Sequence, residues 1–170
     1  MAEAGILHED DRVELIEGEI VQMTAIGSRH AACVARLTTV LTRGVGDRAI
    51  VNPQNPLRLS QLSEPQPDVT LLRPRADYYA QSHPGPGDVL LLVEVSDASL
   101  PYDRGVKLPL YAEFSIPEVW TVDLSARILE ACLDPAQGGY QEIRSLGPGD
   151  RLAPQAFPDI VIDLGKLLGA

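Results

Sequence analysis

The sequence predicts an α/β (α+β) domain in which helices flank a mixed central β-sheet. Its 170 residues, 45% of them hydrophobic, are the size of one domain and are enough to bury a sizeable core. Glycine and proline, fourteen of each, divide the chain into many short elements. Strand-like segments precede and follow two helical ones, an order typical of a mixed sheet with helices packed on it. We therefore expect residues 1–170 to form one domain.

The first half of the chain begins with a predicted β-hairpin. Its two strands, residues 12–17 and 19–24, flank Gly18, which suits a tight turn. Ser28 is a candidate N-cap for a helix that ends just before Gly44. Short strands are then expected near prolines, at residues 49–52, 57–60 and 68–72.

The second half is organised around one apolar strand. Residues 89–95 are continuously apolar up to Glu94, which predicts a central strand covered on both faces. An exposed loop is expected before it, at residues 73–88, and a helix after it, from residues 101–103 to about Phe114. The remaining predicted elements are strands at residues 118–123, 128–133 and 140–145 and a short amphipathic helix at 164–168.

Charge and composition exclude several classes of protein. A net charge of -10 argues against binding DNA through a broadly basic surface, so nucleic-acid binding would need a local basic patch or a metal ion. No apolar run approaches the roughly 20 residues of a membrane span. The acidic residues 1–10 are unlike a secretory signal, and Cys33 and Cys132 resemble buried thiols. We therefore expect a cytoplasmic protein with no membrane partner.

Two acidic residues are candidates for chemistry. Glu94 stands near the end of the apolar strand, where it either faces solvent or is compensated by a cation. Asp68 follows Pro67 and begins another strand. Carboxylates from two neighbouring strands at one sheet edge can share a hard divalent cation, which prefers oxygen ligands.

Lys107 is the third candidate. The chain holds twelve arginines and only two lysines, Lys107 and Lys166, so an amine at this position is unusual for the sequence. An amine can stabilise developing negative charge from a single point. The alternative is a surface ion pair between Lys107 and Asp103, one helical turn earlier.

These residues lie in segments that resemble the Uma2 family, which is placed among the PD-(D/E)XK nucleases. The similar segments are residues 12–20 (RVELIEGEI), 28–30 (SRH), 67–68 (PD), 94–96 (EVS), 102–111 (YDRGVKLPLY), 116–123 (IPEVWTVD) and 157–163 (FPDIVID). The resemblance implies a restriction-endonuclease-like PD-(D/E)XK core with an N-terminal β-hairpin.

The resemblance also implies a set of site residues. Asp68 and Glu94 match the two acidic positions and would be both catalytic and metal-binding residues. The superfamily usually places a lysine two positions after the second acid, where this chain has Ser96. In the Uma2 pattern the following helix supplies the lysine, and Lys107 occupies that place as a catalytic residue. Glu14 and His30 match frequent family positions as accessory residues, although for His30 the favoured interpretation is that it caps a helix or packs.

The function implied is that of a Mg²⁺-dependent (or Mn²⁺-dependent) endonuclease that hydrolyses phosphodiester bonds of DNA. Two alternatives stay open: a non-catalytic binding or dimerisation module on a nuclease fold, and a metal-dependent phosphoesterase with a non-DNA substrate. Because the late hairpin at residues 128–145 is apolar and offers a strand edge, we also expect a homodimer.

Overall fold

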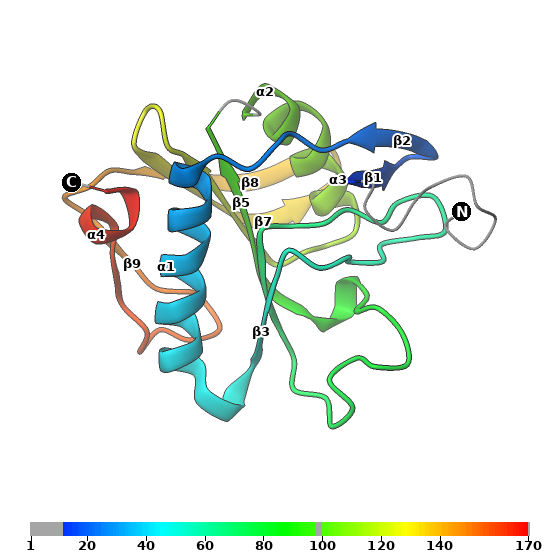
Figure 1. Ribbon diagram of the computed structural model, residues 1–170, viewed down its shortest axis with the longest axis horizontal. Coiled ribbons are helices and arrows are strands. Elements are labelled where there is room, and N and C mark those ends of the chain that lie inside the picture. The colour runs from blue at the N-terminus through cyan, green and yellow to red at the C-terminus, as the bar shows by residue number, and fades with distance from the viewer. Residues whose placement is uncertain (1–11, 98–99, 170) are drawn as a thin grey trace.

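The computed structural model describes residues 12–97 and 100–169, and its centre is a mixed sheet (Figure 1). Within these residues six strands pair in the order β3-β4-β5-β6-β7-β8. Neighbouring strands β5 and β6 are parallel, and every other adjacent pair in this sheet is antiparallel. The strands are β3 (Ile50–Pro53), β4 (Val69–Leu72), β5 (Val89–Ser96), β6 (Glu118–Asp123), β7 (Ile128–Ala136) and β8 (Gly139–Leu146). The expected mixed sheet is confirmed.

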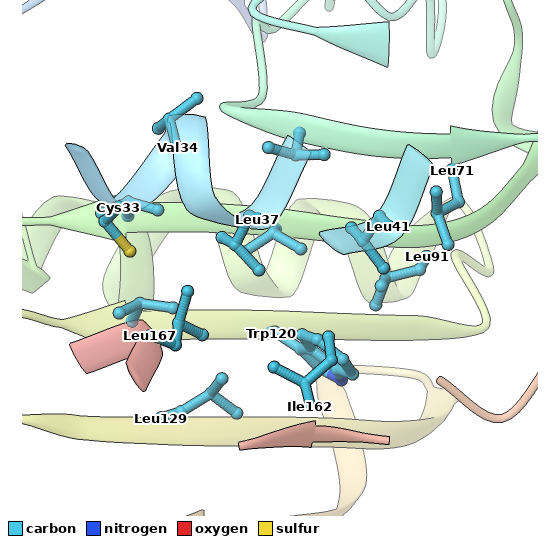
Figure 2. Packing of buried hydrophobic residues seen from close by; sticks show 14 of the residues in the cluster. Cys33, Val34, Leu37, Leu41, Leu71, Leu91, Trp120, Leu129, Ile162 and Leu167 are labelled. Atoms are coloured by element: carbon cyan, nitrogen blue, oxygen red, sulfur yellow. The ribbon is translucent and has the colours of Figure 1, made fainter. Parts of the chain in front are cut away.

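Helices cover both faces of the sheet. Helix α1 (Ser28–Val45) lies on one face, where its apolar stripe packs on Trp120 and the odd-numbered positions of β5 (Figure 2). The second face carries a helical segment made of α2 (Leu100–Tyr102), the π-helical turn η4 (Asp103–Lys107) and α3 (Leu108–Glu113). Strand β5 is therefore buried from both sides, as its continuous apolar sequence predicts.

Smaller elements complete the fold. The hairpin of β1 (Val13–Ile16) and β2 (Glu19–Gln22) forms as expected, and its two turn residues, Glu17 and Gly18, both have positive φ. The remaining elements are the 3₁₀ turns η2 (Gly46–Arg48) and η3 (Pro86–Asp88), the strands β9 (Arg151–Leu152) and β10 (Ile162–Asp163), and helix α4 (Leu164–Leu168). No helix in the described residues is long and apolar enough to cross a membrane.

The structure corrects three local expectations. Residues 57–60 are not a strand, because their backbone N–H groups bond to carbonyls of separate loops, those of Ser63, Pro65 and Pro84. Ser28 is not the N-cap of α1, since Gly27 takes that position. Helix α1 also continues past Gly44, where a side chain would clash with Ile160. Residues 1–10, which bear on the expected absence of a signal, lie outside the described residues.

The helix expected from residues 101–103 to 114 is present, but its middle turn is wide. The N–H of Leu108 bonds to the carbonyl of Asp103, five residues back, which is the π-helical pattern. Pro109, the next residue, has no N–H to continue a regular ladder. The wide turn buries both Asp103 and Lys107, which are each 5% exposed.

Candidate active site

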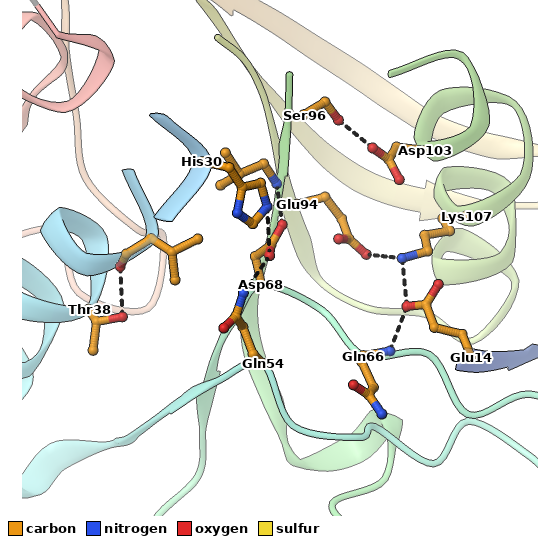
Figure 3. A network of polar contacts seen from close by, with 12 residues as sticks. Glu14, His30, Thr38, Gln54, Gln66, Asp68, Glu94, Ser96, Asp103 and Lys107 are labelled. Carbon is orange, nitrogen blue, oxygen red and sulfur yellow. Dashed lines mark hydrogen bonds and ion pairs between the residues drawn. The ribbon is translucent and has the colours of Figure 1, made fainter. Parts of the chain in front are cut away.

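The candidate site lies at the ends of β4 and β5, where two groups of polar contacts meet (Figure 3). Asp68 immediately precedes β4, and Glu94 lies near the end of β5. The strands are antiparallel and Val69 pairs with Val93, so Asp68 comes next to Glu94 across the two strands. The strands are second and third in the sheet, so the two acids lie at the ends of interior strands and not on an edge strand.

Asp68 is held by three segments of the chain. His30 Nε2, in the first turn of α1, lies 3.0 Å from Asp68 Oδ1. Gln54 Nε2, just after β3, donates to the same oxygen at 3.4 Å. The N–H of Val95 donates to Oδ2 at 2.8 Å. These contacts fix the carboxylate against the residue that follows Glu94.

Glu94 and Lys107 form the second group. Lys107 Nζ lies 3.2 Å from Glu94 Oε1 and 2.7 Å from Glu14 Oε1, so the ammonium bridges β5 and the N-terminal hairpin. Tyr111 Oη donates to Glu94 Oε1 at 2.5 Å, and the N–H of Gln66 donates to Glu14 Oε1 at 2.7 Å. The side chains of Glu14, Glu94 and Lys107 are each 6% exposed or less. This is a buried, cross-linked cluster and not a surface ion pair.

At the position where the superfamily usually has a lysine, this chain has Ser96, which has a structural role. The hydroxyl of Ser96 forms a short hydrogen bond with Asp103 Oδ2 in the π-helical turn. Both residues are buried. The bond ties the end of β5 to the turn that carries Lys107, which helps to aim the lysine at Glu94.

Burial and charge shift the pKa values of the central pair. Burial raises the pKa of Glu94, Lys107 lowers it, and the nearby carboxylates of Asp103, Asp68 and Glu14 raise it again, for a net value of about 8. Burial opposes the charged form of Lys107, but Glu94 and Glu14 outweigh it and raise the pKa of the lysine above its usual value. Lys107 is therefore an ammonium, which can donate hydrogen bonds but cannot act as a base at neutral pH.

The residues present fit a divalent metal ion. The carboxylates of Asp103, Asp68 and Glu14 lie close enough to raise the pKa of Glu94, so a cation bound there would favour the ionised form of that glutamate. A carboxylate has about four acceptor positions. Oδ2 of Asp68 accepts one described bond, from the N–H of Val95, and no bond to Glu94 Oε2 occurs within the described residues. Hard oxygen donors suit Mg²⁺, which often needs only one or two carboxylates plus substrate phosphate and water.

The metal fit does not depend on a third protein ligand. In the described parts of the chain no three acidic, histidine or cysteine side chains converge at metal-ligand spacing. Two buried polar atoms near the cluster nevertheless lack a partner among the described residues, His30 Nδ1 and Tyr102 Oη.

The structure brings all five sequence-predicted residues into the two groups: Glu14, His30, Asp68, Glu94 and Lys107. The alternative interpretations, in which Glu94 faces solvent and Lys107 forms a surface ion pair, are both wrong, because both side chains are buried. The cation that compensates Glu94 is the lysine itself.

Two residues that contact the site acids, Tyr111 and Gln54, were not predicted from the sequence. Tyr111 follows Lys107 by four residues, a spacing that could have placed it on the same helical face, but an aromatic residue there resembles core. Gln54 reaches Asp68 from a left-handed backbone with φ of 51°. A non-glycine residue in that conformation leaves no signal in the sequence.

The fold and the site define the class of this protein. A mixed sheet flanked by helices, with carboxylates and a lysine gathered at the ends of two neighbouring strands, is a nuclease-like arrangement. The model of the Uma2 family, described as "Putative restriction endonuclease", matches residues 2–165, and the chain belongs to this family.

A solved structure shares the fold. It is the crystal structure of a "putative nuclease belonging to DUF820" from Anabaena variabilis, with a TM-score of 0.75 and 13% sequence identity. The similarity covers 98% of this chain and 94% of that chain. A search among curated proteins found no match.

Proposed function

We propose that the protein is a Mg²⁺-dependent endonuclease, also able to use Mn²⁺, that hydrolyses phosphodiester bonds of DNA. One observation carries the proposal: a buried, charged lysine contacts Glu94 while Asp68 lies beside that glutamate on the neighbouring strand. Membership of the Uma2 family supports the same function.

Asp68 and Glu94 would hold the metal through their open oxygens. When bound, the ion would polarise a phosphoryl oxygen and lower the pKa of a coordinated water. His30, Gln54 and the N–H of Val95 orient Asp68 before any ligand arrives. Such preorganisation removes the cost of arranging the carboxylate during the reaction.

Lys107 would stabilise the negative charge that grows on the phosphoryl group. Its ammonium keeps its proton at neutral pH, so it donates hydrogen bonds without leaving the charged state. Glu14 holds the amine from the side of the hairpin and acts as a positioning residue. Water supplies the oxygen that joins phosphorus and gives up a proton to the solvent, the bond from phosphorus to the leaving oxygen breaks, and that oxygen takes up a proton from the solvent.

The charge of the chain favours a second candidate. A net charge of -10 is unusual for a DNA-cleaving protein, so a metal-dependent phosphoesterase with a smaller, non-DNA substrate is the alternative. The same charge also suits a non-catalytic binding module on this fold.

A cleavage assay separates these functions. Supercoiled plasmid is incubated with Mg²⁺ and wild-type protein, Asp68→Asn or Glu118→Gln. Glu118 is a matched control, because it is also a buried acid on the sheet but bonds to Trp120 and Gln155 instead of the site. The proposal expects nicking by the wild type and the control and its loss in Asp68→Asn. Cleavage of cyclic dinucleotides in place of plasmid would support the phosphoesterase, and no hydrolysis of either would support the binding module.

A further inference from the structure

A groove runs along α1 on the side that faces the C-terminal segment. One hollow of about 490 Å³ lies between α1 and the β10–α4 segment, and a second of about 360 Å³ continues toward the start of α1. The two share Arg36 and Leu167 in their walls. We call this continuous feature the α1–α4 groove; Figure 1 shows α4 beside α1.

The α1–α4 groove concentrates positive charge in an acidic protein. Five of the fourteen Lys and Arg residues line it, against one of the twenty-four Asp and Glu residues, Asp163. The five cations are Arg29, Arg36, Arg43, Arg127 and Lys166. By contrast, the hollow beneath α3 is lined by Glu17 and Glu113 and by no Lys or Arg.

Most of these cations keep their charge available for an anion. In the described part of the chain no carboxylate lies within ion-pair distance of Arg36, Arg43, Arg127 or Lys166. Arg36 and Arg127 donate to backbone carbonyls near the end of the chain, which orients them without neutralising them. The one acid in the groove, Asp163, caps α4 by accepting the N–H groups of Gly165 and Lys166.

The spacing of three arginines makes a linear array. Arg29, Arg36 and Arg43 are seven residues apart on α1, close to two helical turns, so they lie on one side of the helix. Each interval is about 10 Å at 1.5 Å per residue, which is about three nucleotides at 3.4 Å per phosphate along a strand. An array of this kind fits a repeating polyanion better than a single small ion.

One end of the array, Arg29, is the sequence neighbour of a residue of the candidate site, and its guanidinium also pairs with Asp97 at 3.1 Å. Arg29 precedes His30, whose imidazole contacts Asp68. A strand whose scissile phosphate lies at Asp68 and Glu94 would pass Arg29 before it reaches Arg36 and Arg43 along α1.

We infer that the α1–α4 groove binds the phosphodiester backbone of a nucleic-acid strand and guides it to the site of Asp68 and Glu94. The inference deepens the proposed function, because it rests on a nucleic-acid substrate for that site. It also explains how a chain of net charge -10 holds a polyanion: the contacts are local, and the acidic surface lies elsewhere.

Binding without cleavage tests this inference separately from the nuclease function. Fluorescence anisotropy is measured in EDTA with a labelled 20-nucleotide strand and a 20-base-pair duplex, in the Asp68→Asn background. The Arg36→Gln/Arg43→Gln variant is compared with Arg144→Gln/Arg151→Gln, which removes the same charge from exposed positions on β8 and β9. Circular dichroism checks that each variant is folded.

We expect the groove variant to bind about tenfold more weakly, or worse, while the control binds as its parent does. The affinity of the groove variant for duplex should also depend less steeply on salt concentration. The slope of log affinity against log salt should become smaller by about 0.9 for each phosphate that the variant no longer neutralises. Equal weakening in the two variants, unchanged binding in both, or no oligonucleotide binding by the parent would overturn the inference. If binding weakens as expected but the wild type cleaves no plasmid, the proposed nuclease function fails and the groove assignment stands.

Discussion

Lys107 Nζ lies 3.2 Å from Glu94 Oε1, although thirteen residues separate the two in sequence. The lysine arrives from the π-helical turn on one face of the sheet and meets a glutamate from a strand buried on both faces. The superfamily usually has a lysine two positions after this glutamate, where the chain has Ser96. The helical segment therefore supplies the ammonium instead of the strand.

Lys107 should be important for folding as well as for catalysis. Replacing it in Lys107→Met leaves Glu14 buried without its cation, which typically costs about 3–5 kcal/mol when a buried pair is broken, while Glu94 takes up a proton because the lysine no longer lowers its pKa. We expect a decrease of this size in the free energy of unfolding, measured in urea. Stability within about 0.5 kcal/mol of wild type would contradict the buried cluster.

A second substitution separates the two roles of the lysine. In Lys107→Met/Glu14→Gln the uncompensated charge of Glu14 is removed, so we expect part of the stability to return while cleavage stays at least about a hundredfold below wild type. The single variant Glu14→Gln serves as the control. Recovery of cleavage together with stability would show that Lys107 acts only in folding.

Metal affinity should increase with pH. Burial and the neighbouring carboxylates raise the pKa of Glu94 to about 8, and only the ionised form can bind a cation. Below that pKa each increase of one pH unit should tighten Mg²⁺ binding by up to about tenfold, and above it affinity should level off. Calorimetry in buffers of different ionisation enthalpy measures both the affinity and the proton released. An affinity independent of pH between about 6 and 8 would exclude Glu94 as a ligand.

Tyr111 should affect the pH dependence of Mg²⁺ affinity. The substitution Tyr111→Phe removes the O–H that donates to Glu94 Oε1 at 2.5 Å and keeps the buried ring. Losing a donor to the carboxylate disfavours its ionised form, so the pH at which Mg²⁺ affinity levels off should move upward. Tyr140→Phe is the control, since its hydroxyl bonds to the carbonyl of Ile116 and not to the site. Identical pH profiles for the two variants would remove Tyr111 from the site.

Homodimerisation stays a prediction, and the sheet offers one place for it. Strand β8 is an outer strand of the six-stranded sheet, with Ile143 54% exposed. An open edge can pair with a second copy, although the Arg144–Glu142 ion pair beside Ile143 disfavours indiscriminate pairing. We expect light scattering at micromolar concentration to show a dimer that Ile143→Lys dissociates. A wild type that scatters only as a monomer would exclude it.

The sequence predicts the sheet well because its signals are local. The apolar run of β5 and the prolines and glycines between elements mark most strands directly. The predicted strand at residues 57–60 is wrong because Leu57 and Leu59 are buried like strand residues while their N–H groups bond to carbonyls in loops and not to a neighbouring strand. Strands β9 and β10, two residues each, are too short to leave a pattern.

The candidate site can be predicted only in part from the sequence, because some of its contacts are not local. An acid in an apolar strand requires compensation, and this requirement points to a cation. The partner depends on the π-helical turn, whose width is set by backbone geometry around Pro109 that no periodicity shows. The contacts of Glu14 and Gln54 depend on loops distant in sequence and are visible only in the fold.

The proposed mechanism requires that Asp68 and Glu94 together hold a divalent metal beside Lys107. Crystals of the wild type and of Glu94→Gln, soaked in Mn²⁺ and measured for anomalous scattering, locate any such ion. We predict one manganese peak within about 2.0–2.3 Å of an oxygen of each carboxylate, weakened or absent in Glu94→Gln. A wild-type map with no peak between Asp68 and Glu94, at a Mn²⁺ concentration that supports cleavage, would show that the two acids do not share a metal.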